Sequence, residues 1–199
     1  MVSQAERRAA TIHGVEDAAR KLFASRGFAD TTIDDIAARA GVAKGAVYHH
    51  FSSKEEIFTR VLESIQAELA AAQIPPPSAK PRDPLDMISA GVLRYLLAIS
   101  EPDIRRILLI DGPAIVGWQK WRDIDMRHFG ALTKAALAGA LGEKVPPREI
   151  EPLAHLLMGA IMEAALMCAT AEHPKKLAKE LSAGIRALLG GLESRRRIQ

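Results

Sequence analysis

The chain has 199 residues, of which 48% are hydrophobic and 26% are charged, which is enough apolar material for a packed core and too much for a disordered chain. The single cysteine, Cys168, cannot form an internal disulfide, and no Cys/His cluster has zinc spacing, so a reducing compartment such as the cytoplasm is expected. The net charge is only +3, and residues 1–70 carry nine basic against ten acidic side chains, so bulk charge does not argue for nucleic-acid binding.

Apolar residues recur at helical spacing along nearly the whole chain, and alternating segments rich in Val, Ile and Thr are absent, so we predict an all-α fold. The first helix is predicted from an apolar stripe between Val15 and Phe23 and is expected to end at Gly27. The later helices are expected at about 32–40, 44–50, from 53 onward, 85–100, 103–110, 114–120, 121–141, 148–170 and 174–189.

Two local signals mark the fourth helix and the segment that follows it. Ser53 and Glu56 form a predicted capping box, in which the serine hydroxyl accepts from the amide three residues on and the glutamate reaches back. Residues 73–84 contain five prolines, which remove amide donors and disfavour helix, so a stiff linker is predicted there.

Residues 31–51 have the pattern of a helix-turn-helix, whose second helix can enter the major groove of DNA. Ala37 is small where the two helices cross, Gly41 suits a positive φ in the turn, and Ile36 and Val47 supply apolar anchors. The helix-turn-helix itself is predicted at about 32–51.

Side chains that can donate to phosphates or base edges surround the second of these helices. Lys54 lies at a helix N-terminus that already favours phosphate, and Arg7 and Arg8 are expected on a flexible arm before the first helix. The DNA-binding candidates are Thr31, Thr32, Lys44, Gly45, Ala46, Tyr48, His49, His50 and Lys54. The competing interpretations are a structural three-helix module and, for Tyr48 alone, a packing role.

The segment GFADTTIDDIAARAGVAKGAVYHHFSSKEEIF resembles the DNA-binding domain of the TetR family of transcriptional regulators. The resemblance implies an all-helical homodimer with a DNA-binding domain at 9–69 and a larger effector-binding and dimerisation domain at 70–199, which dimerises through its last two helices. It also implies a ligand-responsive repressor that binds a palindromic operator. Ala43 and Ala46 stand where many members have Ser or Thr, so no relative's operator is transferable.

The C-terminal half contains the most hydrophobic stretch, 153–170, which is shorter than a bilayer span and is predicted to be a helix buried on every side. Glu163 in this helix needs a partner if it is buried, either an effector or a neighbouring Arg or His155. The candidates for an effector pocket are Trp118, Trp121, Met126, His128, Phe129, Met158 and Glu163, with an ordinary core role as the alternative for the aromatics.

No catalytic motif is present: the sequence lacks G-x-S-x-G, H-E-x-x-H, a phosphate loop and a dinucleotide fingerprint. His128, His155 and Glu163 could in principle meet as metal ligands, but nothing in their spacing requires it. We therefore predict a non-enzymatic, sequence-specific DNA-binding regulator without cofactor or metal, whose partners are operator DNA, an unidentified small molecule and a second copy of the chain. Cys168 is expected to be an inert buried thiol, and 195–197 a solvated basic tail.

Overall fold

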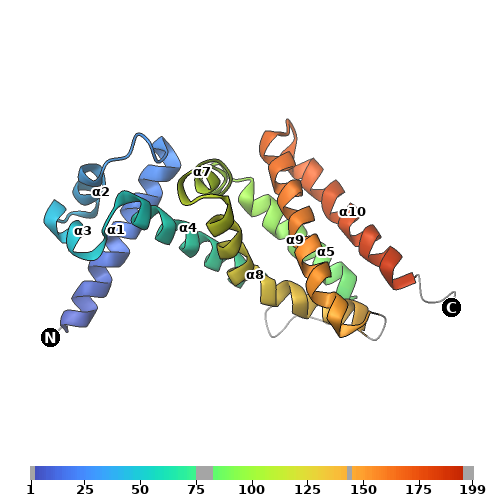
Figure 1. The fold of residues 1–199 in the computed structure, drawn as a ribbon. Helices are drawn as coiled ribbons and strands as arrows, with labels where there is room; N and C mark the ends of the chain where they lie inside the picture. Colours follow the sequence, from blue (N-terminus) through green and yellow to red (C-terminus); the bar gives the residue numbers. More distant parts are fainter. Residues whose placement is uncertain (1–2, 75–82, 143–144, 195–199) are drawn as a thin grey trace. The chain divides into compact units, whose positions relative to one another are not determined.

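The computed structural model describes residues 3–74, 83–142 and 145–194, and every regular element in these ranges is a helix, as predicted (Figure 1). Part of the linker expected at 73–84 and the basic tail lie outside the described residues. The helices are α1 Gln4–Arg26, α2 Ile33–Ala40, α3 Lys44–His50, α4 Lys54–Ala71, α5 Pro84–Ile99, α6 Pro102–Arg105, the π-helix η1 Arg106–Asp111, α7 Gly112–Val116, α8 Trp118–Leu141, α9 Pro147–Thr170 and α10 Pro174–Ser194.

The chain divides into two compact units, and the first of them is discontinuous in sequence. It combines residues 1–65 with residues 102–121, while the second combines 66–101 with 122–199. Helices α4 and α8 therefore contribute residues to both units. A division of the chain by sequence position alone, at about residue 70, does not describe this exchange of segments.

Local signals explain where the first helices begin and end. Thr32 caps α2 by accepting from the amide of Asp35 at 3.1 Å, and the Asp35 carboxylate accepts from the amide of Thr32 in return. Gly41 ends α2 with φ 70° and ψ 28°, the left-handed conformation that a side chain disfavours. The turn between α2 and α3 is thus determined by short-range chemistry.

The predicted capping box of α4 is confirmed in one half and shifted in the other. The Ser53 hydroxyl accepts from the amide of Glu56 at 3.1 Å, as expected. The Glu56 carboxylate, however, accepts from the amide of Ser52 at 2.8 Å and not from that of Ser53. The carboxylate reaches one residue further because the Ser52 hydroxyl also donates to it at 2.7 Å.

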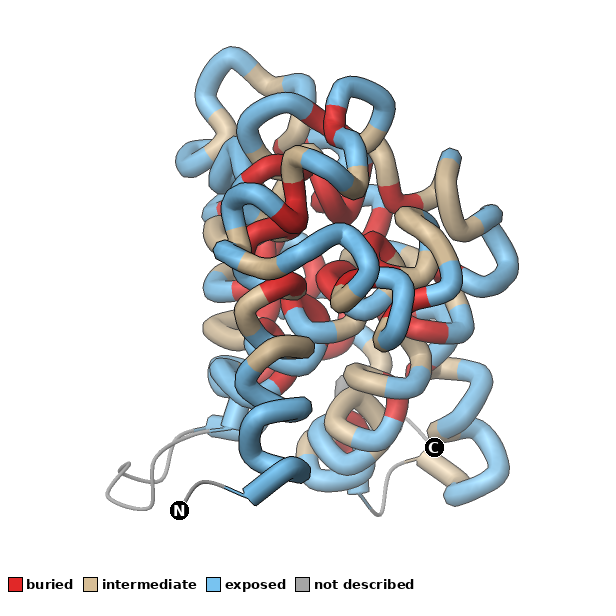
Figure 2. Tube along the Cα trace, turned by 90° about the vertical axis from the view of Figure 1, so that its left-hand side faces the viewer, coloured by how far each residue is buried: buried red, intermediate tan, exposed pale blue. Residues whose placement is uncertain are grey.

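The core of the first unit forms where α1, α2, α3 and the first part of α4 meet. Phe23, Phe28 and Phe58 contact one another with ring centroids 5.2–5.7 Å apart. Ile36 and Val47 have no exposed surface and anchor α2 and α3 to this cluster. Burial of each such side chain contributes about 1.5–3 kcal/mol, so the small module is held mainly by these anchors. Figure 2 marks the buried segments along the Cα trace in red and the exposed segments in pale blue.

In the second unit α5, α9 and α10 pack against one another, as Figure 1 shows. The Ser89 hydroxyl on α5 donates to the carbonyl of Ser182 on α10 at 3.0 Å, and Asp86 forms an ion pair with Arg186. Cys168 is buried, and burial raises the pKa of its thiol, which agrees with the predicted inert role.

Helix α9 differs from its prediction, because it is not buried on every side. Leu156 is 70% exposed, and Leu166, Met167 and Glu163 also lie on its exposed side. By length and composition alone this helix could cross a membrane, and 39% of its most apolar window is buried. Within the part of the chain that the structure describes, neighbouring segments cover only one side of α9.

Candidate DNA-binding surface and effector cavity

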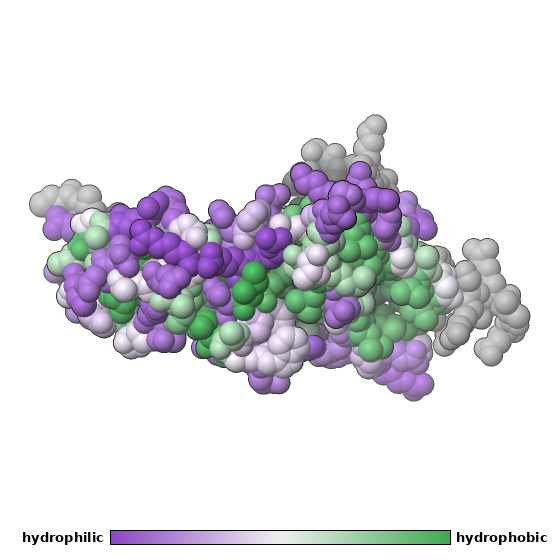
Figure 3. All heavy atoms as spheres, turned by 90° about the horizontal axis from the view of Figure 1, so that it is seen from above, coloured by the Kyte–Doolittle hydropathy of each residue, from purple (hydrophilic) through white to green (hydrophobic). Residues whose placement is uncertain are grey.

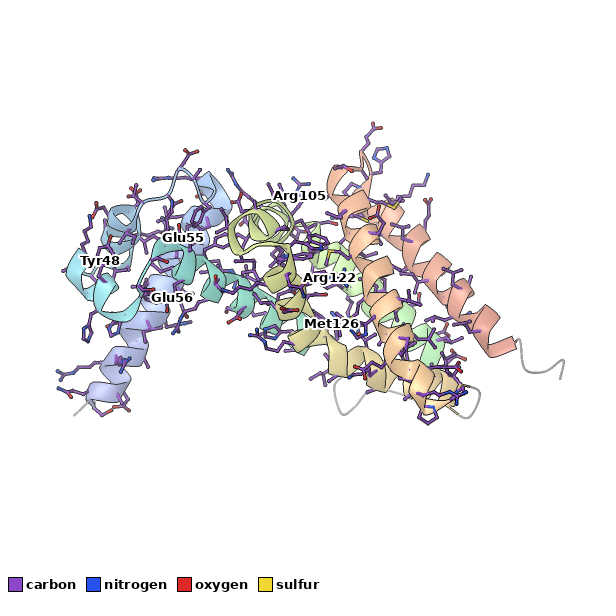
Figure 4. The ribbon with its side chains drawn as sticks, in the orientation of Figure 1. Tyr48, Glu55, Glu56, Arg105, Arg122 and Met126 are labelled. Carbon is purple, nitrogen blue, oxygen red and sulfur yellow. The ribbon has the colours of Figure 1, made fainter. Side chains whose placement is uncertain are left out.

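Helix α3 presents a polar surface because its opposite side is anchored in the core. Val47 is fully buried, whereas Tyr48, one residue on, is 51% exposed. Figure 4 shows Tyr48 on the outer side of α3. The protein covers only about half of Tyr48, so packing does not account for the whole side chain. Gly45 is also exposed, and a Cβ at this position would meet no atom within 4 Å, so another backbone has room to approach.

Lys44 is exposed at the start of α3 and pairs with an acidic neighbour. Its Nζ lies 2.9 Å from the carboxylate of Asp34 in α2, and both side chains are more than half exposed. The hydrogen bond to Asp34, supported by its charge, raises the pKa of Lys44. The positive charge is thus kept at the surface, where salt screening leaves the pair little net stability.

The two histidines at the end of α3 have different surroundings. His49 is exposed, and its ring lies 4.9 Å from that of His50, centroid to centroid. Burial lowers the pKa of His50, and the nearby charges of His49 and Arg8 lower it further. His49 is the more accessible of the two donors. Ala46, on the same helix, is half-buried.

Thr31 does not lie on this surface, in contrast to its prediction. It is fully buried, and its hydroxyl donates to the carbonyl of Gly27 at 2.8 Å. Thr32 is exposed, although its hydroxyl donates to the Asp35 carboxylate at 2.6 Å. The sequence offers two adjacent hydroxyls, and the turn before α2 directs one of them inward.

Lys54 is held by the protein itself. Its Nζ donates to the carbonyls of Phe28 and Thr31, each at 2.8 Å, and lies 4.1 Å from the centroid of the Phe28 ring. Two of its three N–H donors are therefore occupied. Arg7 and Arg8 lie within the first turns of α1, so the expected flexible arm is helical from Gln4.

A polar clamp from residues 102–121 was not predicted from the sequence. The Arg106 guanidinium donates to the carbonyls of Ser25 and Arg26 at 3.2 and 2.7 Å, at the C-terminal end of α1. The carboxylate of Asp111 accepts from the amide of Phe28 at 3.0 Å. These contacts join positions 80 to 83 residues apart, so no local pattern indicates them.

The two tryptophans belong to the first unit and do not line the cavity of the second. Trp121 is buried, and its indole N–H donates to the carbonyl of Leu108 at 2.9 Å. Trp118 stacks on it at 5.2 Å and is 53% exposed. The alternative core interpretation therefore holds for Trp121.

A cavity of about 490 Å³ lies in the second unit, within the size range of small-molecule sites. Its wall is mostly apolar and comes mainly from α5, α8 and α9. The lining residues used below are Ile88, Val92, Tyr95, Asp125, Phe129 and Met162.

Two of the seven predicted pocket residues, Phe129 and Met158, line this cavity. Met126 and His128 lie on α8 outside its lining, and Figure 4 shows Met126 on that helix. Glu163 is exposed on α9, so it needs no buried partner. The prediction missed Tyr95 and Asp125, because helical spacing marks α5 and α8 as amphipathic without indicating which faces enclose a space.

Asp125 and Tyr95 are two polar groups in the mostly apolar wall of the cavity. Burial raises the pKa of Asp125 to about 6, while the Arg122 charge and a 3.4 Å hydrogen bond from Gln66 lower it. Tyr95 packs edge-on against Phe129 at 5.3 Å. Burial, with the nearby Asp125 charge, raises the pKa of Tyr95 well above its ordinary value. Among the described residues, neither the Tyr95 hydroxyl nor Gln66 Oε1 has a hydrogen-bond partner.

Metal binding finds no support in the described ranges, where no three His, Cys, Asp or Glu side chains gather as ligands. His155 is exposed, with Nδ1 3.0 Å from the carbonyl of Glu151 on its own helix. His128, His155 and Glu163 are thus not brought together as a ligand set.

A helix-turn-helix with an outward-facing basic and aromatic surface, in one chain with a helical unit that encloses a cavity, defines a DNA-binding transcriptional regulator. Residues 16–61 match the family model described as bacterial regulatory proteins, tetR family, and residues 85–192 match the tetracyclin repressor-like C-terminal domain. Because the second match covers more than half of the chain, the protein belongs to the TetR family. This family consists of transcriptional regulators and not of enzymes, which confirms the predicted class.

Relatives support the same assignment. The chain is similar to the crystal structure of a TetR-family transcriptional regulator from Pectobacterium atrosepticum, with 28% identity, a TM-score of 0.78, and 97% and 98% of the two chains covered. It is 29% identical over 93 residues to the transcriptional regulator AcrR of Shigella flexneri, which is 47% of this chain and only 43% of that protein. RolR, crystallised with resorcinol, shares the fold at 18% identity and a TM-score of 0.70, over 96% and 97% of the chains.

Proposed function

We propose that this TetR-family regulator is a ligand-responsive repressor that binds a palindromic operator as a homodimer in the cytoplasm. The observation that carries the DNA-binding part is the exposed row of Lys44, Tyr48 and His49 on a helix anchored by buried Val47. Such a helix fits the major groove, where a lysine and a histidine donate to base edges or phosphates and a tyrosine ring contacts thymine methyl groups.

The proposed homodimer is supported by apolar side chains that the single chain leaves uncovered. Leu156, Leu166 and Met167 on α9 and Leu188 on α10 are 38–72% exposed. Figure 3 shows apolar residues at the surface on the side of the molecule where these helices lie. A two-fold pairing of these helices would cover them and hold two copies of α3 about 34 Å apart, one turn of DNA.

The proposed ligand response uses the two helices that belong to both units. Helix α8 contributes Trp121 to the core of the first unit and, one turn later, Asp125 to the cavity of the second. Helix α4 contributes Leu62 to the first unit and Gln66, which bonds Asp125, to the second. A ligand that changes the contacts of Asp125 therefore acts on both helices. A coupling of about 1–3 kcal/mol would lower DNA affinity about 5- to 150-fold.

Selection from random duplexes tests the DNA-binding proposal. We expect the full-length protein to enrich one short palindrome and to bind it in the presence of excess competitor DNA. Equal affinity for all duplexes would instead indicate a nonspecific architectural protein, and tight binding to no duplex would refute DNA binding altogether. Release of the enriched duplex by a cavity ligand is the further result that a ligand-responsive regulator requires.

A further inference from the structure

We propose that the cavity of the second unit binds a neutral, apolar molecule that carries a hydroxyl group, a phenol or an alcohol, with this hydroxyl bonded to Tyr95 and Asp125. The inference rests on the proposed function, because it names the chemical class of the ligand in a ligand-responsive regulator.

The hydrogen-bonding groups of the wall are incompletely satisfied. Tyr95 has a hydroxyl donor that meets no acceptor among the described residues, and the residue is only 5% exposed. Asp125 accepts one long hydrogen bond, 3.4 Å, from Gln66, which leaves most of its acceptor capacity unused. Leaving such buried groups unpaired is costly, so a ligand that pairs both gains affinity and specificity.

A hydroxyl satisfies both side chains at once through a single atom that accepts and donates. Its oxygen accepts from Tyr95, and its hydrogen is donated to the carboxylate of Asp125. An ammonium group provides donors only and leaves the Tyr95 hydrogen without an acceptor. A carboxylate ligand would bring a second negative charge to Asp125, and an ether would lack the donor that Asp125 needs.

The charges around the site also favour a neutral ligand. Arg122, one turn before Asp125 on α8, already provides the attraction that partly offsets burial of the carboxylate. Figure 4 shows Arg122 on α8. The carboxylate thus lacks hydrogen-bond donors more than it lacks a positive charge, and burial of a further cation in the apolar wall would carry its own desolvation cost.

The rest of the cavity fits an apolar body. Ile88 and Val92 on α5 and Met162 on α9 line it, and Phe129 lies edge-on to the Tyr95 ring. Aliphatic and thioether side chains adapt to an aromatic or alkyl frame without hydrogen bonds. At about 490 Å³ the space accommodates a ring with a short alkyl chain.

Three probes of similar size separate the alternatives: 4-butylphenol, 4-butylanisole and 4-butylbenzylamine. Their dissociation constants for the full-length protein are measured by isothermal titration calorimetry. We expect the phenol to bind at least about tenfold more tightly than the anisole, which lacks the donor, and more tightly than the charged amine. Equal affinity for phenol and anisole, or a preference for the amine, would overturn the proposal.

Variants of the cavity wall test which side chains cause the preference for the phenol over the anisole. Asp125→Asn should reduce the ratio of phenol to anisole affinity toward one, whereas Asp123→Asn, on the exposed side of the same helix, should keep it. Tyr95→Phe should weaken phenol and anisole alike, because the oxygen of each can accept from the Tyr95 hydroxyl. The ratio is informative because a general loss of packing weakens both probes alike. Thermal unfolding of each variant verifies that it is folded. An unchanged ratio in Asp125→Asn, or undiminished binding of both probes in Tyr95→Phe, would contradict the assignment.

The proposal on the ligand class and the proposal on DNA binding can fail independently of each other. If no probe binds at millimolar concentration while the enriched palindrome is still bound, the hydroxyl proposal fails and DNA binding stands. If the phenol binds with the expected preference but no duplex is bound, the proposal on the cavity is supported and the proposed DNA-binding function fails.

Discussion

Lys54 shows how one side chain can serve the architecture of a DNA-binding module in place of the DNA contact that its position indicates. It joins the start of α4 to the carbonyls of Phe28 and Thr31 and lies over the Phe28 ring. The same position at a helix N-terminus favours a phosphate. Stability and salt dependence distinguish the two roles, because only a phosphate contact releases counterions on binding DNA.

We expect Lys54→Gln to lower the free energy of unfolding by about 1–3 kcal/mol, because it removes two charge-assisted hydrogen bonds and a cation–π contact. Urea titration measures this loss, with Lys21→Gln, exposed on α1, as the control. A phosphate contact would in addition reduce the slope of log affinity against log salt concentration by about one. Unchanged stability would show that the two carbonyl contacts contribute nothing.

Asp34 competes with DNA for the ammonium group of Lys44. Asp34→Asn removes this competitor and a negative charge beside the candidate surface, so we expect DNA affinity to rise about two- to fivefold, more at low salt. Fluorescence anisotropy at several salt concentrations measures the change, and Asp103→Asn on α6 is the control. If affinity did not change, Lys44 would not be a DNA contact.

Asp125 gives the stability of the protein a pH dependence with a defined sign. Its pKa of about 6 in the folded state lies above the ordinary value of 3.8, so the folded state retains a proton that the unfolded state has lost between these values. The stabilising contribution is complete below about pH 4 and is lost as the pH rises through 6.

We therefore expect Asp125→Asn to be more stable than the parent protein at pH 7.5, by up to about 3 kcal/mol, and nearly equal to it at pH 4. Urea titration at both pH values measures the difference, with Asp123→Asn as a control for removal of an exposed carboxylate. A difference that is the same at both pH values would contradict the burial of this carboxyl group.

At the scale of elements, the join between α1 and η1 depends on a glycine. Gly27 has φ 87°, and a Cβ at this position would lie within 2.9 Å of the Arg106 guanidinium carbon. Gly27→Ala therefore strains the backbone and displaces the group that caps α1, and we expect a loss of about 1–3 kcal/mol.

A second glycine in the same helix is the matched control. A Cβ at Gly14 would meet nothing within 4 Å, and the residue lies inside α1. Gly14→Ala should stabilise the protein by about 0.5–1 kcal/mol through helix propensity. Thermal unfolding of the two variants should shift in opposite directions, and a shift in the same direction would show that Arg106 yields at no cost.

The segment 102–116 is also where an element prediction was wrong. Separate helices were expected at about 103–110 and 114–120, but α6, η1 and α7 follow one another without a break, and α7 ends at Gly117, which has φ 82°. Pro113 lies in the first turn of α7, directly after the π-helix η1. Gly112 is required by packing, since a Cβ would lie 2.9 Å from the Ile107 carbonyl and 3.0 Å from Leu62. Such a close approach is a tertiary constraint.

At the scale of the whole molecule, the uncovered faces of α9 and α10 determine the expected assembly. Leu188 is 72% exposed on α10, so Leu188→Glu should place a charge in the proposed dimer interface. We expect a monomer in sedimentation velocity and at least about tenfold weaker binding to a full palindrome. Ile110→Glu, at a position 59% exposed in the first unit, is the control. If the Leu188→Glu protein were still a dimer, the dimer interface would have to lie elsewhere on the chain.

The sequence alone determined the helical fold and the DNA-binding module, because both depend on short-range chemistry. Helical periodicity, the Thr32 cap, the turn glycine at position 41 and the anchors Ile36 and Val47 all act within a few residues of one another. The exposure of Lys44 and Tyr48 then follows from the burial of Val47 on the opposite side of a helix of seven residues.

Only the tertiary structure decided which side chains enclose the cavity and which hold α1 to the segment after α5. Tyr95 and Asp125 line the same cavity from positions 30 residues apart in sequence, and Arg106 reaches a carbonyl 80 residues before it. Thr31 turned inward, Glu163 turned outward, and Trp121 joined the first unit for the same reason. Helical periodicity indicates that a helix has a buried side, but the packing of distant segments determines which partner buries it.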